Sequence, residues 1–145
     1  MYNALQISGF IVYYCIRNSL RLSNLRLQKI LYFVQAEFLI SEKHACFYNE
    51  IEAWDFGPVV PEVYNKYKIF GSSNIEVAYS NDIESSIDFH DRTVIINVIE
   101  ACKQYSTYQL VSITHSQSPW LDNYSKGSYN TISQQCIREY FGNAS

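Results

Sequence analysis

The chain has 145 residues, a common length for one domain, and a domain of this size holds a core without disulfides or metals. Hydrophobic residues make up 48% and charged residues 17%, which excludes an intrinsically disordered chain. The formal net charge of −3 is too small to indicate a nucleic-acid or membrane partner. We therefore expect a single globular domain over residues 1–145.

Positive charge is concentrated at the N-terminal end. Residues 1–36 contain Arg17, Arg21, Arg26 and Lys29 and no Asp or Glu, whereas the rest of the chain is strongly acidic. Two interpretations are open. The four cations are the solvated faces of helices, or they form a basic patch that meets an acidic partner.

Cysteine usage and the N-terminal segment both indicate an intracellular, cytoplasmic protein. Cys15, Cys46, Cys102 and Cys136 are far apart and form no CxxC or CxxH pair that would begin a zinc site. Three of them lie among apolar neighbours, where a reduced Cys behaves as a small hydrophobic residue. The apolar stretch 4–16 lacks the basic region and cleavage site of a secretory signal, and it is too short to span a bilayer.

Hydrophobic periodicity predicts two helices in the first third of the chain. Apolar residues recur at helical spacing over about 3–18, and a second apolar stripe predicts a helix over about 24–42. Arg26 and Lys29 fall off the second stripe, so we expect both to face water or a partner.

The middle segment loses this period. Residues 50–54 alternate as a strand does, and Gly57-Pro58 is expected to end that strand as a turn. Pro61 suits the first turn of a helix over 61–70.

The remaining elements follow from periodicity and capping signals. We expect a short strand over 75–79 that pairs with 50–54, followed by a polar loop over 80–90. Helices are then expected over 91–105, from 106 or 107 onward, and over 118–120. A last helix is expected from a Thr131-x-x-Gln134 capping box to a stop at Gly142. The expected fold class is mainly α (α+β at most), a compact bundle of about five to seven helices with a small two-stranded β element in the middle.

Residues capable of catalysis or metal binding form no recognisable motif. His44, His90 and His115 lie in separate predicted elements, with no HExxH or paired-His spacing. His115 follows an apolar helical run and is interpreted as half-buried with a backbone partner, whereas Glu50 and Glu52 are interpreted as a solvated strand edge. No Gly-rich loop follows a strand, so phosphate binding has no support. We expect no enzyme, no catalytic residue, no cofactor and no bound metal.

Aromatic residues are abundant, with thirteen Tyr, eight Phe and two Trp. Rings in this number form either the boundary of the core or an aromatic binding face, and both interpretations are open. Trp54 and Trp120 lie beside the turn-forming residues Gly57-Pro58 and Pro119, so we expect both indoles to be largely buried where the chain reverses direction.

Three blocks are more specific than packing alone requires: LRLQKILYF at 25–33, IEAWDFGPVVPEVY at 51–64 and THSQSPW at 114–120. Their order and spacing resemble the Panacea antitoxin domain, a family that includes SocA-like proteolytic adaptors and phage-associated proteins. The resemblance extends from about residue 4 to 141, and the central block is its most specific part.

The resemblance implies a bacterial or prophage protein that binds and neutralises a toxin encoded nearby. The alternative is a phage-encoded adaptor or modulator that binds a host protein or a protease. No nucleic-acid, membrane or cofactor partner is implied, and the oligomeric state is left open. The family-motif residues, expected to be mostly structural, are Leu27, Gln28, Lys29, Tyr32, Glu52, Trp54, Gly57, Pro58, Pro61, Tyr64, His115, Pro119 and Trp120.

Residues near these blocks are the candidates for contact with a partner. They are Arg17, Arg21, Arg26, Lys29, Tyr48, Tyr64 and Tyr67. An enzyme or a nucleic-acid-binding protein is a third class, which a co-purifying ligand or salt-dependent DNA binding would reveal.

Overall fold

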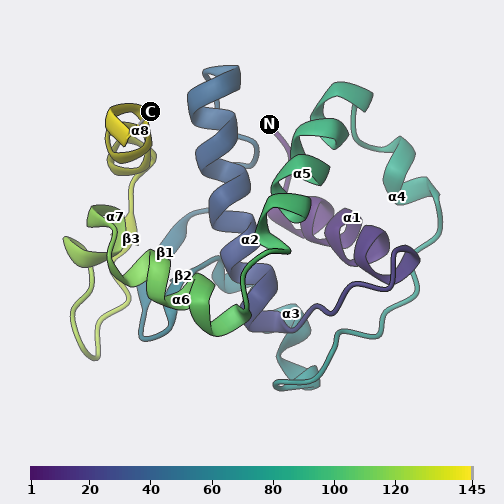
Figure 1. Cartoon of the computed structure of the whole chain (residues 1–145), viewed down its shortest axis with the longest axis horizontal. Helices are drawn as coiled ribbons and strands as arrows, with labels where there is room; N and C mark the ends of the chain where they lie inside the picture. Colours follow the sequence, from purple (N-terminus) through teal and green to yellow (C-terminus); the bar gives the residue numbers. More distant parts are fainter. Residues whose placement is uncertain (145) are drawn as a thin grey trace.

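Figure 1 shows the fold of the chain in a computed structural model that describes residues 1–144. The elements in chain order are α1 (Ala4–Arg17), α2 (Asn24–Glu37), the π-helical turn η1 (Phe38–Glu42), β1 (Ile51–Trp54), β2 (Gly57–Val59), α3 (Pro61–Tyr67), the 3₁₀ turn η2 (Lys68–Phe70), α4 (Asp82–Ser85), α5 (Phe89–Cys102), α6 (Thr107–His115), α7 (Ser118–Leu121), β3 (Thr131–Ile132) and α8 (Gln134–Ala144). The predicted mainly α class is confirmed, with eight α-helices and one small antiparallel sheet over the described residues. Within the same range, no helix is long and apolar enough to cross a membrane.

Helix α2 is the centre of the fold. In Figure 1 it lies between α8 on one side and α5 and α1 on the other, and it also contacts α3, α6 and β2. A helix surrounded in this way has little solvated surface, so even its polar residues Gln28, Lys29 and Gln35 are buried. The expectation that Lys29 faces water or a partner is therefore wrong. Amphipathic periodicity assumes a solvent-facing side, and α2 has almost none.

Strands β1 and β2 form a hairpin whose turn is Asp55-Phe56, because Trp54 pairs with Gly57 across the two strands. The predicted turn at Gly57-Pro58 is wrong, since these two residues begin β2. Gly57 instead supplies a positive φ of +107° at the point where the second strand starts.

The third strand comes from the C-terminal region, because the sheet order is β2-β1-β3 and β1 pairs with β3 through Ile51 and Ile132. The prediction that 75–79 pairs with β1 is wrong. That segment lies beside the connection between α1 and α2 instead, where the Ile75 N–H donates to the Leu22 carbonyl at 2.9 Å.

Three boundaries also differ from expectation. Helix α4 lies inside the predicted loop, which is why the number of helices exceeds seven. Thr131 belongs to β3, and the cap of α8 is Ser133, whose hydroxyl accepts the Cys136 N–H at 3.1 Å. Gly142 lies inside α8 and does not end it.

Three of the four cysteines are buried as small apolar residues, and all four are unbridged. Burial raises the pKa of the Cys15 thiol to about 12 and that of Cys102 to about 11. Because the thiolate is the nucleophilic form, burial keeps these thiols unreactive.

Replacing Gly57 by Ala is expected to destabilise the fold by about 2–4 kcal/mol. The new Cβ would lie 2.7 Å from Thr114 Oγ1 and 2.9 Å from Lys29 Cε, at a φ of +107°. Urea unfolding measures the change. Gly127→Ala is the matched control, because its φ is also positive, at +81°, but no heavy atom lies within 4 Å of the added Cβ. Equal losses in the two variants would show that close packing at Gly57 has no role.

Candidate functional site

The three sequence blocks meet behind the β1–β2 hairpin. Lys29 Nζ donates to the Pro58 carbonyl at 2.7 Å, and Gln28 Oε1 accepts the Val60 N–H at 2.9 Å. Strand β2 is an edge strand, and its exposed backbone groups would otherwise need other partners. Side chains of α2 therefore close this edge of the sheet.

The turn of the hairpin is held from α6, α7 and the loop that follows them. His115 is half-buried, and its Nε2 lies 2.9 Å from the Asp55 carbonyl, to which it donates in the Nε2–H tautomer. The Trp120 indole donates to the Trp54 carbonyl at 2.7 Å, and the Tyr124 hydroxyl donates to Asp55 Oδ1 at 2.6 Å. The rings of His115, Trp120 and Tyr124 stack in sequence. Two successive backbone carbonyls at the turn are thus fixed by ring nitrogens.

Lys29 is fully buried, and its ammonium group has no carboxylate partner among residues 1–144. Desolvation lowers the pKa of Lys29 to about 7. The side chain acts as a donor to the hairpin backbone and cannot reach a binding partner.

Tyr67 is a second predicted partner residue that the structure buries. It is 1% exposed, and its hydroxyl pairs with that of Tyr79 at 2.7 Å. Helix α3 packs this side of itself against α1, so Tyr67 lies in the core. Tyr48, in contrast, is 56% exposed, and Tyr64 is half-buried.

The four predicted cations do not all reach the surface, because Lys29 is buried. Arg26 is half-buried and donates to the Cys102 carbonyl at 2.6 Å and to Thr107 Oγ1 at 3.3 Å, so it links α2 to α5 and α6. Arg17 and Arg21 are exposed, and the Arg17 guanidinium lies 5.4 Å from the centre of the Tyr13 ring. Arg21 and Arg26 line one hollow, so a basic patch without Lys29 stays a prediction.

Beside the hairpin lies a group of four aromatic rings, two exposed and two half-buried, which we call the hairpin surface: Trp54, Phe56, Tyr64 and Tyr129. Phe56 is 65% exposed and Tyr129 is 64% exposed. The centroid of the Trp54 ring lies 4.9 Å from that of Tyr64, in an edge-on contact, and 4.7 Å from that of Tyr129, in a stacked contact. These four side chains line one hollow of about 390 Å³.

Trp54 belongs to this surface rather than to the core. The expectation that both indoles are largely buried is confirmed for Trp120, which is 9% exposed, whereas Trp54 is only partly buried. Glu52 Oε1 accepts the Trp54 Nε1–H at 2.9 Å and thereby fixes the indole orientation. Phe56 and Tyr129 were not among the predicted contact residues, although the abundance of aromatic residues left an aromatic binding face open as one interpretation.

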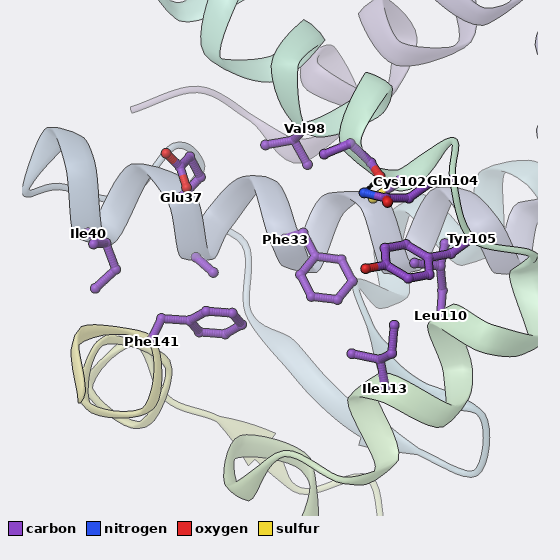
Figure 2. A pocket seen from close by; sticks show the side chains of 12 residues that line it. Phe33, Glu37, Ile40, Val98, Cys102, Gln104, Tyr105, Leu110, Ile113 and Phe141 are labelled. Carbon is purple, nitrogen blue, oxygen red and sulfur yellow. Dashed lines mark hydrogen bonds between the residues drawn. The ribbon is translucent and has the colours of Figure 1, made fainter. Parts of the chain in front are cut away.

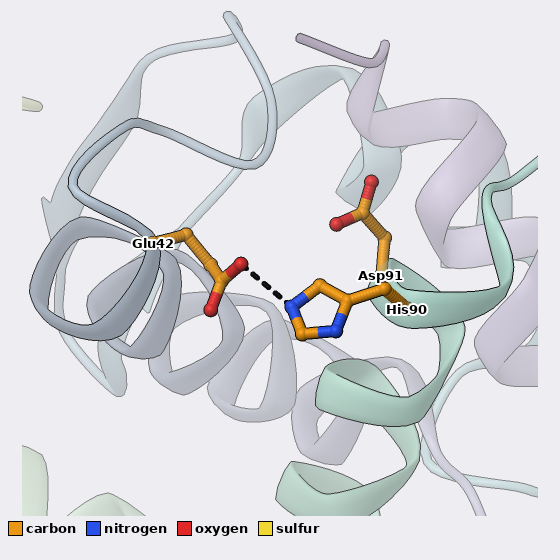
Figure 3. Close-up of side chains that lie close together, drawn as sticks. All are labelled: Glu42, His90 and Asp91. Atoms are coloured by element: carbon orange, nitrogen blue, oxygen red, sulfur yellow. Dashed lines mark hydrogen bonds and ion pairs between the residues drawn. The ribbon is translucent and has the colours of Figure 1, made fainter.

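A separate cluster of potential metal ligands lies between η1 and α5. Glu42, His90 and Asp91 place one ligand atom each within 4.8 Å of one another (Figure 3). His90 Nε2 lies 2.7 Å from Glu42 Oε1, and this hydrogen bond is the main reason that the pKa of Glu42 is lowered. Asp91 Oδ2 accepts the Tyr2 hydroxyl at 2.6 Å. Each side chain already has a protein partner, so the cluster is explained as a link between three segments.

Replacing Lys29 by Met is expected to change how stability depends on pH. The folded-state pKa is about 7 and the unfolded value is near 10.4, so between these values the unfolded state binds more protons. The stability of the parent protein should therefore rise from pH 7 toward pH 9, by on the order of 2 kcal/mol from this group. The Lys29→Met protein should lose that rise in stability. The Lys66→Met protein should keep it, because Lys66 is an exposed residue of α3. Unfolding curves at several pH values measure the difference, and parallel profiles for the parent and Lys29→Met would contradict it.

Comparison with known proteins places this arrangement in a family. The model for the family of SocA-like antitoxins, Panacea domain, matches residues 27–121, a range that contains the hairpin and most of the side chains that hold it. The chain is 35% identical over 111 residues to antitoxin SocA of Caulobacter vibrioides (strain NA1000 / CB15N); the alignment covers 68% of this chain and 58% of that relative's length. No solved structure matches the chain. The resemblance of the three sequence blocks is thus confirmed, and the chain belongs to the family of SocA-like antitoxins with a Panacea domain.

Proposed function

We propose that the protein is an antitoxin that binds a cognate toxin directly and neutralises it, with the hairpin surface as the main contact. In this proposal the protein acts in the bacterial cytoplasm by binding alone and carries no catalytic residue. The proposal rests on the exposed rings of Phe56 and Tyr129, which lie beside a hairpin whose backbone is held by side chains of other elements. The chain also belongs to an antitoxin family.

The physics of protein interfaces favours this surface. Aromatic side chains contribute large contact areas, and they cluster in the few positions that dominate binding energy. Four hydrogen bonds to the backbone of the hairpin and the residue after it hold it in place, so little conformational entropy is lost when a partner binds. The hollow beside Trp54 can receive a side chain of the toxin.

An adaptor that brings its partner to a protease is the second candidate. It is favoured by membership of the family of SocA-like antitoxins, because the resemblance implies that some members are proteolytic adaptors. The chain spans 58% of the length of the antitoxin SocA relative. Both candidates use a surface for the partner, and they differ in whether neutralisation requires proteolysis.

Co-expression with the products of neighbouring genes tests the proposal. Rescue of growth from one toxic product, together with co-purification of the pair, is the expected result. Rescue should persist in a strain without ATP-dependent proteases. Rescue that is lost in such a strain would support the adaptor, and the absence of rescue and of co-purification for every neighbouring product would overturn both.

Replacing Phe56 or Tyr129 by Ser is expected to weaken toxin binding by about tenfold or more, since each removes an exposed ring at the proposed contact. Calorimetric titration measures affinity. Tyr108→Ser is the matched control, because Tyr108 is 81% exposed but lies outside the hairpin surface. Melting temperatures should be nearly unchanged in all three variants. Equal affinities of Tyr129→Ser and Tyr108→Ser would count against the hairpin surface.

A further inference from the structure

A second hollow lies along α2 on the side that faces α8. Figure 2 shows it as a trough whose floor is one face of α2 and η1, with α5 along one wall and α6 and α8 along the other. Its volume is about 470 Å³. Its lining residues are Phe33, Ala36, Glu37 and Ile40 on the floor, Val98, Ala101 and Cys102 from α5, Gln104 and Tyr105 from the following turn, Leu110 and Ile113 from α6, and Phe141 from α8.

The floor has the repeat of a helix face. Phe33, Ala36, Glu37 and Ile40 are spaced i, i+3, i+4 and i+7, and this stretch of α2 and η1 is about 10 Å long, or two turns. Ala36 lines the trough between two larger apolar residues and is 3% exposed. Because its side chain is small, we call this position of the floor the notch. Small residues at a helix contact let two backbones approach closely, and larger residues fill the notch from the other side.

Ring contacts join the floor of the trough to the wall formed by α8. The ring centroids of Phe33 and Phe141 lie 6.3 Å apart in an edge-to-face contact, and those of Phe33 and Tyr32 lie 5.2 Å apart. The Tyr32 hydroxyl in turn donates to Gln117 Oε1 at 2.7 Å. The floor and the α8 wall are therefore held in place relative to each other.

Among the residues that the structure describes, Glu37 is the only charged one that lines the trough. It is exposed, and its carboxylate has no ion pair or hydrogen bond among the described residues. An unpaired acid beside an apolar channel complements an occupant that is apolar on one face and basic next to it.

We propose that this trough binds an amphipathic helix of a protein partner, with the apolar stripe of that helix against α2 and a Lys or Arg opposite Glu37. Such a helix would complete a bundle with α2, α5, α6 and α8, which is the usual way that an apolar groove between helices is filled. The trough shares no lining residue with the hollow of the hairpin surface. It is a second docking site, and it does not depend on the toxin proposal.

The test uses the full chain and a fluorescein-labelled, hydrocarbon-stapled model helix. The peptide carries Leu at i, i+3, i+4 and i+7 and one Lys beside that stripe; a scrambled peptide and a peptide with Glu in place of the Lys are the controls. Fluorescence anisotropy is expected to give micromolar binding of the Lys peptide and much weaker binding of the scrambled peptide.

Charge reversal then tests the role of Glu37. Glu37→Lys is expected to weaken binding of the Lys peptide by about tenfold and to strengthen binding of the Glu peptide, through the reversed pair. Glu76→Lys, an equal change of charge at an exposed residue outside the trough, should change neither affinity strongly. Ala36→Trp should fill the notch and abolish binding of both peptides.

Three results would overturn the proposal. They are equal binding of the Lys and scrambled peptides, equal effects of Glu37→Lys and Glu76→Lys, and unchanged binding by a folded Ala36→Trp protein. The exposed Glu37 variant keeps the test valid if Ala36→Trp does not fold. Phe56→Ser should leave peptide binding unchanged, so failure of this site and failure of the toxin proposal are separate outcomes.

Discussion

A lysine without a counter-ion inside a core is costly, because the ammonium group loses its hydration and recovers only the hydrogen bonds that the protein offers. Lys29 is in this position, and it donates to the Pro58 carbonyl. The contact joins the central helix to an edge strand, and it requires Gly57, since a Cβ there would collide with the lysine stem and with Thr114. The LQK and GPVVP segments of the sequence therefore supply the two partners of one contact. Lys29 comes from the first segment, and the Pro58 carbonyl and Gly57 come from the second.

The same contacts leave the aromatic rings of the hairpin surface free of structural duties. Side chains of α2 close the edge of β2, and His115 and Trp120 hold the turn, so these polar backbone groups of the hairpin are occupied. Phe56 and Tyr129 take no part in those contacts and are exposed. Most motif residues thus hold the hairpin in place, whereas the hairpin surface combines the motif residues Trp54 and Tyr64 with Phe56 and Tyr129.

Helix α2 serves both candidate surfaces. Its N-terminal half holds the hairpin through Gln28 and Lys29, and its C-terminal half, with η1, forms the floor of the trough through Ala36 and Glu37. A helix buried on nearly all sides is a rigid base, because side chains in a close-packed core have few alternative positions. Two partners could bind the hairpin surface and the trough at the same time without a change of fold. An adaptor requires two such surfaces, whereas an antitoxin that acts by binding alone requires one.

Local periodicity, caps and motifs were enough to predict the helical class, most helix positions, the family and the burial of Trp120. The positions of Lys29 and Trp54 depend instead on how the elements pack. A cation off an apolar stripe predicts exposure when a helix has a solvent side, and the packing of α1, α3, α5, α6, α8 and β2 around α2 removes that side. Likewise, β1 pairs with β3, which is distant in the sequence. Strand pairing depends on which segments the helices bring together, and local sequence patterns contain no information about that.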